Sequence, residues 1–383
     1  MSGIGNILVI EIMKNIYIGL MTGTSVDAID ISAVRIEKST YKIIDSKSYI
    51  YPEEIRNKVL AISRREKPFD SESIRKMDHK IGEIYSESIN NFIDLQTFNK
   101  NNIRAIGIHG QTIEHSPNAK VPRSLQIGNA ELVAKKIGVT CIANFRNADI
   151  QAGGQGAPLA PIFHSWLFRS ENHNIAVINI GGISNISILK NEEVSGYDLG
   201  PGNALLDAWS QNNDKGEYDY NGGWAVTGEL NNDLLDLLLK DEFIRREPPK
   251  STGTDYYNLN WIQEKISSTG LTIKPADVQC TLTEYSARII LQSINSEIVF
   301  DQVILCGGGT KNSFLFESIK NKYNGKIYKT NDFGLDASDI ESIGFAYLAY
   351  LRVKEVEIDL SKITGSSKKV LLGKVFSPDI KHD

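Results

Sequence analysis

The chain has 383 residues, of which 41% are hydrophobic and 23% are charged. This composition is typical of a soluble globular protein, and it excludes a disordered chain, a collagen-like chain and a polytopic membrane protein. The chain has 42 Lys and Arg and 47 Asp and Glu, which gives a formal net charge of -5. A weakly acidic chain is a poor general binder of polyanions, so no nucleic acid partner is expected, and any bound phosphate must be held by local geometry.

Residues 1–14 open the chain with a short apolar patch. The patch is too short to span a bilayer, a glutamate interrupts it, and no basic leader precedes it. We therefore expect a cytoplasmic protein with no membrane partner, in which residues 1–14 form a loose extension.

The first half of the chain continues with strands that short polar turns interrupt. Residues 16–21 are apolar, residues 22–25 break the run, and residues 28–36 alternate between apolar and polar, which predicts two strands joined by a turn. The elements predicted to follow are a strand at 41–51, a helix at 71–95, a strand at 103–108, a helix that Asn129 caps and Gly138 ends, and a strand at 139–143.

The second half repeats this pattern. An apolar strand at 175–180, a turn at Gly181 and Gly182 and a returning strand at 183–189 match the hairpin at 17–34, which hints at a duplicated unit. The further predicted elements are helices at 202–211, 227–240, 281–294 and 311–320 and a strand at 302–306. Strands that alternate with helices predict an α/β protein with mixed sheets, and the length favours two domains.

Two features are interpreted as structural. The charged run 245–250 is expected to be a solvated face or loop, as such runs usually are. Cys141, Cys280 and Cys306 lie far apart and form no C-x-x-C pair, so neither a disulfide framework nor a zinc site is predicted.

The common nucleotide-binding signatures are absent from the sequence. It contains no G-x-x-x-x-G-K-[ST] and no G-x-G-x-x-G between a strand and a helix, which argues against a P-loop NTPase and a standard Rossmann dehydrogenase. Short turns rich in Gly, Thr, Ser and Asn follow several apolar strands instead. At such turns, backbone N–H groups can converge on phosphate oxygens.

The first of these turns is 23–30. Its glycine permits close backbone approach, and the hydroxyls of Thr24 and Ser25 add donors. Asp27 or Asp30 can orient a hydrated Mg²⁺. An ordinary hairpin turn would use the same residue types, so this segment alone leaves both interpretations open.

Two further turns are rich in glycine. Gly181 and Gly182 form one, and Gly307–Gly309 forms the other, between a predicted strand and a predicted helix. Three consecutive glycines carry a large conformational entropy cost, and a tight strand-to-helix turn normally needs only one. The triplet therefore favours close contact with a flat adenosine or a phosphate chain.

Asp198 lies at the end of a predicted strand, just before Gly200-Pro201-Gly202 and the start of a helix. Helix N–H groups nearby favour the ionised carboxylate, which suits a general base toward water or a hydroxyl. Asp198 could equally serve only as a cap for that helix, and the sequence does not decide between the two.

Two polar stretches lie beside predicted buried strands. One runs from His109 through Gln111 and Thr112 to His115, and the other covers residues 144–158 and contains Arg146. Amides, hydroxyls and a guanidinium of this kind suit a polyhydroxylated ligand, including one that carries a carboxylate. His109 and His115 lack a third ligand, so metal binding is not predicted there, and each can be a hydrogen-bonded structural residue.

Six motifs follow one another along the chain. They are GTSVD at 23–27, HGQT at 109–112, NFR at 144–146 with QAGGQGAP at 151–158, NIGGISN at 179–185, DLGPGN at 198–203 and CGGG at 306–309. In this order they resemble the anhydro-N-acetylmuramic acid kinase family, which belongs to the actin/hexokinase/heat-shock ATPase superfamily, and the resemblance covers roughly residues 17–351.

The resemblance implies a fold and a domain division. The expected fold is α/β, with two RNase H-like (actin-like ATPase) domains whose mixed sheets are flanked by helices around an interdomain cleft. Residues 15–140 plus about 345–375 would form the N-terminal domain, and residues 141–344 the C-terminal domain. A homodimer is expected from the family alone.

The resemblance also implies a reaction and its residues. ATP and Mg²⁺ would serve to open 1,6-anhydro-N-acetylmuramic acid with water and to phosphorylate O6, giving N-acetylmuramate 6-phosphate and ADP in peptidoglycan recycling. Asp198 would activate the water, and the ligands of the metal stay unassigned. The residues expected to bind ATP are Gly23, Thr24, Ser25, Val26, Asp27, Ala28, Ile29, Asp30, Gly181, Gly182, Gly307, Gly308, Gly309 and Asn312. Those expected to bind the sugar are His109, Gln111, Thr112, Arg146 and Glu341, with Arg146 on the lactyl carboxylate and Glu341 on hydroxyls.

The sequence departs from the family pattern at two positions. Ala28 stands where the first turn usually has glycine, and Leu199 stands where threonine usually follows the aspartate. Both changes could alter the affinity for ATP. A kinase of the same fold that acts on another amino sugar and a non-enzymatic actin-like ATPase are the alternative functions.

Overall fold

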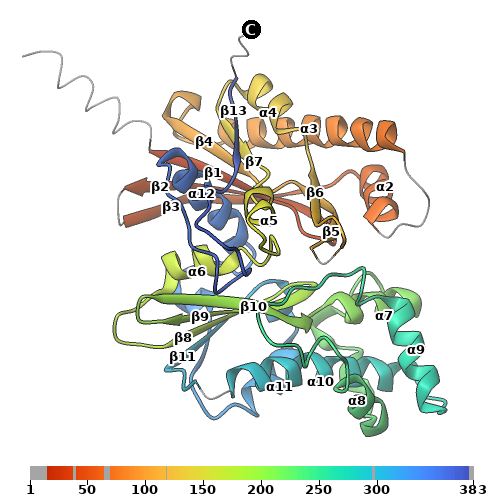
Figure 1. Ribbon diagram of the computed structural model, residues 1–383. Helices are drawn as coiled ribbons and strands as arrows, with labels where there is room; N and C mark the ends of the chain where they lie inside the picture. Colours follow the sequence, from red (N-terminus) through yellow and green to blue (C-terminus); the bar gives the residue numbers. More distant parts are fainter. Residues whose placement is uncertain (1–14, 38–39, 64–69, 118, 296–297, 379–383) are drawn as a thin grey trace, which may run out of the picture. The chain divides into compact units, whose positions relative to one another are not determined.

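The computed structural model describes residues 15–37, 40–63, 70–117, 119–295 and 298–378 (Figure 1). The chain packs as two compact units. Unit 1 comprises Met1–Gly156, Asp339–Ser361 and Ser366–Asp383, and unit 2 comprises Ala157–Ser338 and Lys362–Gly365. The expected extension at residues 1–14 lies outside the described residues.

Unit 1 is built on a six-stranded mixed sheet in the order β13-β7-β4-β1-β2-β3. β1, β2 and β3 are antiparallel neighbours, β4 is parallel to β1, and β7 is parallel to β4. The strands are β1 (Ile16–Met21), β2 (Ala28–Glu37), β3 (Thr40–Ile50), β4 (Ile103–Ile108), β7 (Cys141–Ala143) and β13 (Lys374–Phe376). We expected residues 141–143 in the second domain; they lie in this sheet because β7 pairs with both β4 and β13.

Helices cover both faces of this sheet. Ile18 and Leu20 of β1 share a buried core with Ile81 of α3. Gly19 points to the other face, where a Cβ would lie 1.8 Å from the Ser342 carbonyl oxygen of α12, so only glycine lets helix and sheet approach this closely. The helices are α2 (Glu53–Ser63), α3 (Ser71–Asp94), α4 (Ala130–Ile137), α5 (Asn147–Gln151) and α12 (Ile340–Val353), with a separate hairpin of β5 (Gln111–Ser116) and β6 (Arg123–Ile127).

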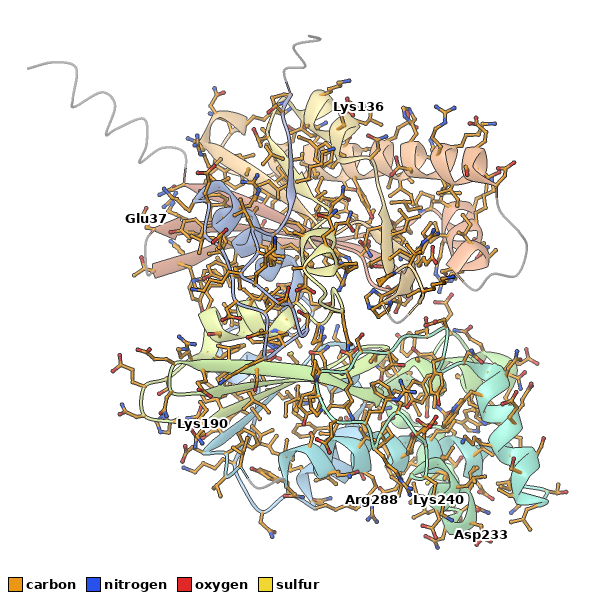
Figure 2. The ribbon with its side chains drawn as sticks, in the orientation of Figure 1. Glu37, Lys136, Lys190, Asp233, Lys240 and Arg288 are labelled. Carbon is orange, nitrogen blue, oxygen red and sulfur yellow. The ribbon has the colours of Figure 1, made fainter. Side chains whose placement is uncertain are left out.

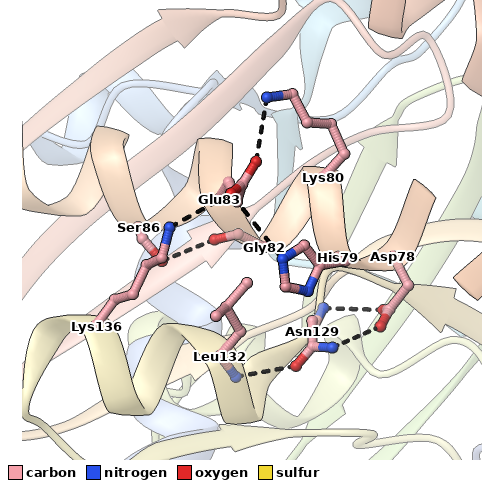
Figure 3. Close-up of polar contacts among 9 residues, drawn as sticks. All are labelled: Asp78, His79, Lys80, Gly82, Glu83, Ser86, Asn129, Leu132 and Lys136. Atoms are coloured by element: carbon pink, nitrogen blue, oxygen red, sulfur yellow. Dashed lines mark hydrogen bonds and ion pairs between the residues drawn. The ribbon is translucent and has the colours of Figure 1, made fainter. Parts of the chain in front are cut away.

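Asp78 of α3 fixes the start of α4 (Figure 3). Its carboxylate accepts hydrogen bonds from the backbone N–H groups of Gly128 and Asn129, at 2.8 and 2.9 Å, and from the Asn129 amide. Asn129 in turn caps α4 through the N–H of Leu132. These bonds set the position of α3, which carries Tyr85 beneath the first polar turn.

Unit 2 repeats the strand order of unit 1. Its five-stranded sheet runs β10-β9-β8-β11-β12, with β8, β9 and β10 antiparallel and β11 parallel to β8. The strands are β8 (Ile175–Ile180), β9 (Ile183–Lys190), β10 (Glu193–Pro201), β11 (Gln302–Cys306) and β12 (Ile327–Lys329). Three antiparallel strands followed by two parallel ones in both sheets confirm the expected RNase H-like α/β fold and the duplicated unit.

Several charged residues on or beside the helices of unit 2 lie on the outside. Figure 2 shows Asp233 of α8, Lys240 just after α8, and Arg288 of α10 projecting away from the sheet. The helices are α6 (Ala160–Phe168), α7 (Ala204–Asn212), α8 (Asn232–Leu238), α9 (Leu259–Thr269), α10 (Pro275–Ile294) and α11 (Ser313–Lys320). Among the helices of the described ranges, none is both long and apolar enough to span a bilayer.

Two helices begin at places that differ from the prediction. α8 starts at Asn232 rather than at 227, because residues 225–227 form a 3-10 turn and Asn231 caps the helix through the N–H of Leu234. α10 starts at Pro275, six residues before the predicted 281, because proline is well suited to the first turn of a helix.

Candidate active site

The first polar turn joins β1 to β2 in unit 1. Val26 has a φ of 53°, and its N–H donates to the Gly23 carbonyl at 3.2 Å. The side chains of Val26 and Ile29 are fully buried, whereas Thr24, Ser25 and Asp27 are exposed. The turn is thus anchored in the core by two apolar side chains and presents hydroxyls and a carboxylate to solvent.

Ala28, the first departure from the family pattern, does not strain this turn. It opens β2 and pairs with Ile50, and its N–H donates to the Asp27 carboxylate at 3.1 Å. The turn residue in the left-handed region is Val26, so glycine's freedom is not needed at position 28.

Buried polar groups hold the turn from beneath. The hydroxyl of Thr22 lies 3.0 Å from that of Tyr85, which also accepts a hydrogen bond from Tyr51 at 3.1 Å. Burial raises the pKa of Tyr85 to about 12, so the phenol stays neutral. Gln111 is 1% exposed and donates to the Gly23 carbonyl at 3.1 Å, so this residue, expected to bind sugar, supports the turn.

His109 and Arg146 form a pair at the end of β4. The guanidinium Nη2 of Arg146 lies 2.9 Å from His109 Nε2, and Nη1 donates to the Gly156 carbonyl at 2.8 Å. Burial and the charge of Arg146 hold the pKa of His109 well below its usual range, so the imidazole is neutral and accepts at Nε2. The pair fixes the direction of the guanidinium.

The loop that carries Gly156 is tied by a second bond. Asp149 is fully buried, and its Oδ2 accepts a hydrogen bond from the Gly156 N–H at 2.7 Å. A Cβ on Gly154 would lie 2.4 Å from the Asp149 carboxylate oxygens, which explains a glycine there. The QAGGQGAP motif therefore forms a rigid support for Arg146.

Glu341 lies in the first turn of α12 and is half-buried. Burial and the nearby Asp30 carboxylate raise its pKa to about 7, while the charge of Arg146 acts in the opposite direction. The structure thus brings Glu341, Asp30 and Arg146 into one electrostatic environment. A carboxyl group with this pKa can hold or release a proton near neutral pH. Thr112 lies in β5, where its hydroxyl accepts from Gln126 at 3.3 Å.

Asp198 lies in β10, an edge strand of the unit 2 sheet, and is 5% exposed. Its N–H donates to the Lys250 carbonyl at 3.1 Å, and its Oδ2 accepts from the Thr252 N–H at 3.0 Å. The residue at the N-cap of α7 is Asn203, so the interpretation of Asp198 as a helix cap is wrong. Leu199, the second departure, is 3% exposed and belongs to the hydrophobic core of this unit.

The Gly181-Gly182 turn joins β8 to β9 and meets the start of α7. The Gly181 carbonyl accepts from the Asn203 N–H at 2.8 Å, and the Gly182 carbonyl accepts from the Gly202 N–H at 2.9 Å. A Cβ on Gly202 would lie 2.4 Å from the Gly181 carbonyl oxygen. The two family motifs at 179–185 and 198–203 therefore form one packed unit.

The glycine triplet after β11 separates into two roles. Gly307 has a φ of +82°, and a Cβ there would lie 2.3 Å from Asn179 Oδ1; a Cβ on Gly309 would lie 2.2 Å from Ile180. A Cβ on Gly308, in contrast, meets no atom within 4 Å. Packing explains Gly307 and Gly309, and Gly308 leaves open space. Asn312 caps α11 through the N–H of Leu315 at 3.0 Å.

Sequence reasoning missed the segment that holds Asp198. The run 245–250 was expected to be solvated, but Lys250 is 8% exposed, so that interpretation is wrong for Lys250. Tyr85 was also missed as a support of the first turn. Neither Lys250 nor Tyr85 belongs to a recognisable motif, and the one signal near Lys250 is the pair of prolines before it. Over the described part of the chain, no cluster of three His, Cys, Asp or Glu suited to a metal ion is present.

Comparison with known proteins agrees with these motifs. The family model for anhydro-N-acetylmuramic acid kinase matches residues 15–378. A protein of that name from Pasteurella multocida is 40% identical over 94% of this chain and 96% of its own length, and one from Haemophilus influenzae is 38% identical over 97% and 100%. Among solved structures, component A of the Acidaminococcus fermentans (R)-2-hydroxyglutaryl-CoA dehydratase is 14% identical over 88% of this chain and 99% of its own, with a TM-score of 0.44, a likeness too low to bear on function. The chain belongs to the anhydro-N-acetylmuramic acid kinase family.

Proposed function

We propose that this chain uses ATP to open and phosphorylate 1,6-anhydro-N-acetylmuramic acid, yielding N-acetylmuramate 6-phosphate and ADP. The observation that carries the proposal is the family match over residues 15–378, within which Asp198 is a buried carboxylate. The reaction serves peptidoglycan recycling. A cytoplasmic location and a homodimer fit such an enzyme.

ATP is assigned to the polar turn 23–30 and to the two glycine-rich turns at 181–182 and 307–309. In the first turn, the exposed hydroxyl of Thr24 can donate to phosphate oxygens, whereas the Ser25 hydroxyl donates to Asp27. The open space at Gly308 supports an approach of the nucleotide to that backbone. Val26, Ile29 and Asn312 are proposed to act only through the backbone, because their side chains are buried or used as a helix cap.

The sugar is assigned to Arg146, Glu341, His109 and Thr112. Arg146 is oriented by His109 and Gly156, and a fixed guanidinium is suited to the lactyl carboxylate. Glu341, with its raised pKa, suits sugar hydroxyls, because in its protonated form it donates and in its ionised form it accepts.

Asp198 is the proposed general base. It takes a proton from a water whose oxygen attacks the anomeric carbon, and the bond from that carbon to O6 breaks with its electron pair moving to O6. O6 then attacks the γ-phosphorus, the bond to the bridging oxygen breaks, and ADP leaves. The proton on Asp198 passes to solvent. The bond from the Thr252 N–H keeps one carboxylate oxygen fixed during this transfer.

Mg²⁺ neutralises charge on the transferred phosphate when bound. Asp27 and Asp30 offer the hard oxygen ligands that this ion prefers, and it commonly needs only one or two carboxylates besides water and phosphate. Asp27 already accepts from the Ser25 hydroxyl at 2.6 Å, which holds its carboxylate toward the exposed side of the turn.

The product of the reaction tests the proposal. The purified chain is incubated with ATP, Mg²⁺ and 1,6-anhydro-N-acetylmuramic acid, and the products are identified by mass spectrometry. A sugar product heavier by both a water and a phosphoryl group is expected. ADP without such a product would overturn the substrate and favour another amino sugar, whereas nucleotide-dependent light scattering without turnover would favour a filament-forming ATPase.

A further inference from the structure

Lys250 is a buried lysine whose surroundings consist of carbonyls and aromatic rings. It is 8% exposed, and its ammonium donates to the carbonyls of Phe243 and Ile244 at 3.3 and 3.0 Å. The same ammonium lies 5.1 Å from the ring centroid of Phe243 and 5.6 Å from that of Tyr197. Within the described part of the chain, no carboxylate forms an ion pair with it.

A buried ammonium without an ion-pair partner is costly. Burial lowers the pKa of Lys250, and the charges of the Glu247 and Asp198 carboxylates partly offset this decrease. An apolar side chain of similar length would fill the same space at lower cost. The charge is therefore expected to serve a purpose other than filling the core.

The backbone of this lysine meets Asp198. The Lys250 carbonyl accepts the Asp198 N–H at 3.1 Å, and two residues later the Thr252 N–H donates to Asp198 Oδ2 at 3.0 Å. β10 is an edge strand, so residues 250–252 occupy its otherwise unpaired side. We call residues 250–252 the strap.

The side chain of Lys250 approaches Tyr197, whereas its backbone carbonyl bonds to Asp198. Successive side chains of a strand point to opposite faces, so Tyr197, which the ammonium approaches, faces away from the Asp198 carboxylate. The hydrogen bonds of the Lys250 ammonium go to the carbonyls of Phe243 and Ile244, so besides the attraction between the two charges Lys250 acts on Asp198 through the strap. Its two bonds to the 243–244 backbone fix one end of the strap, and the Thr252 N–H transmits that position to the carboxylate.

We propose that Lys250 is a positioning residue for Asp198, holding the strap so that the Thr252 N–H orients the carboxylate for proton abstraction. The inference rests on the proposed function, in which Asp198 is the base. Small errors in the placement of a base are costly to the chemical step and do not affect the binding of ATP. The lysine should therefore influence kcat far more than the KM for ATP.

The test compares Lys250→Met, which keeps the apolar stem, with Lys250→Arg, which keeps a charged donor able to lie over aromatic rings. Lys265→Met is the matched control, because the Lys265 ammonium also lies over a ring, at 5.1 Å from the Trp261 centroid, but belongs to α9 and not to the strap. We expect Lys250→Met to lower kcat at least tenfold with the KM for ATP within twofold of wild type. Lys250→Arg should recover part of the loss, and Lys265→Met should match wild type.

Each other outcome has a distinct meaning. If Lys250→Met keeps the wild-type kcat while Asp198→Asn is inactive, the positioning role is overturned and the proposed function stands. If both Lys250 variants fail to fold, or lose melting temperature, kcat and both KM values together, Lys250 is a structural residue and the inference fails. If the wild type does not turn over the anhydro sugar, or Asp198→Asn remains fully active, the proposed function fails and the inference with it.

Discussion

Arg146 owes its fixed direction to two partners of different kinds. A neutral imidazole nitrogen of His109 accepts from Nη2, and a main-chain carbonyl accepts from Nη1. A planar guanidinium can satisfy both while still offering donors, whereas a lysine ammonium cannot reproduce the fork. The role assigned to Arg146 on the sugar carboxylate depends on this geometry.

Arg146→Lys is therefore expected to raise the KM for the anhydro sugar about tenfold, through the loss of bidentate recognition. The KM for ATP should stay within twofold, since ATP is assigned to other residues. Steady-state kinetics on both substrates measure this. Arg169→Lys is the control, because the exposed Arg169 side chain donates to the Glu192 carbonyl. A wild-type sugar KM in the Arg146 variant would remove Arg146 from the sugar site.

Glu341 gives the ligand-free protein a specific pH dependence. Its pKa is raised from 4.5 to about 7 in the folded state, so between these values the folded protein holds a proton that the unfolded chain releases. The contribution of this carboxyl to the free energy of unfolding therefore falls as pH rises through that window.

Glu341→Gln removes this titration. The variant is expected to match wild type in stability near pH 4.5 and to exceed it by about 2 kcal/mol at pH 8, a figure reduced from the full shift because the residue is only half-buried. Urea unfolding across this pH range measures the difference. Parallel pH profiles for the two proteins would show that Glu341 is not perturbed.

At the scale of elements, the turn after β11 contains one glycine that packing requires and one that packing does not require. Gly307 combines a φ of +82° with a close approach to the backbone of Ile180, where a Cβ would lie 2.7 Å from the carbonyl oxygen. Gly308, one residue on, has open space. The two positions therefore give a matched pair of substitutions in one turn.

Gly308→Ala should keep the wild-type melting temperature and raise the KM for ATP about tenfold, because its methyl group enters the space assigned to the nucleotide. Gly307→Ala should lose about 2 kcal/mol of stability or more, from backbone strain and the clash. Thermal unfolding and kinetics in parallel distinguish the two. An unchanged KM for ATP in Gly308→Ala would remove the nucleotide from this turn.

The helices and strands could be predicted from the sequence, whereas the residues that hold the site residues in place could not. Apolar runs such as 16–21 and 175–180 predict strands because burial on both faces leaves a continuous apolar pattern. The long helix at 71–95 matches α3 to within one residue. What pairs with Gly23 or Asp198 depends on contacts between segments more than fifty residues apart, and a single sequence carries no trace of them.

At the scale of the whole molecule, the same strand order occurs twice, yet the two units carry different side chains at corresponding places. The turn after β1 of unit 1 presents Thr24, Ser25 and Asp27, whereas the turn after β8 of unit 2 consists of two glycines whose carbonyls join the start of α7. Repetition of the fold thus supplied two scaffolds, and the chemistry is assigned to residues of both.

The central claim is that Asp198 is the base for opening the anhydro ring, and the most direct measurement is the activity of Asp198→Asn together with its affinity for ATP. Asparagine keeps the size of the side chain and an acceptor for the Thr252 N–H, but it cannot take a proton at neutral pH. We predict a loss in kcat of about a thousandfold or more, with the Kd for ATP unchanged. An Asp198→Asn protein that forms the phosphorylated sugar at the wild-type rate would contradict the account.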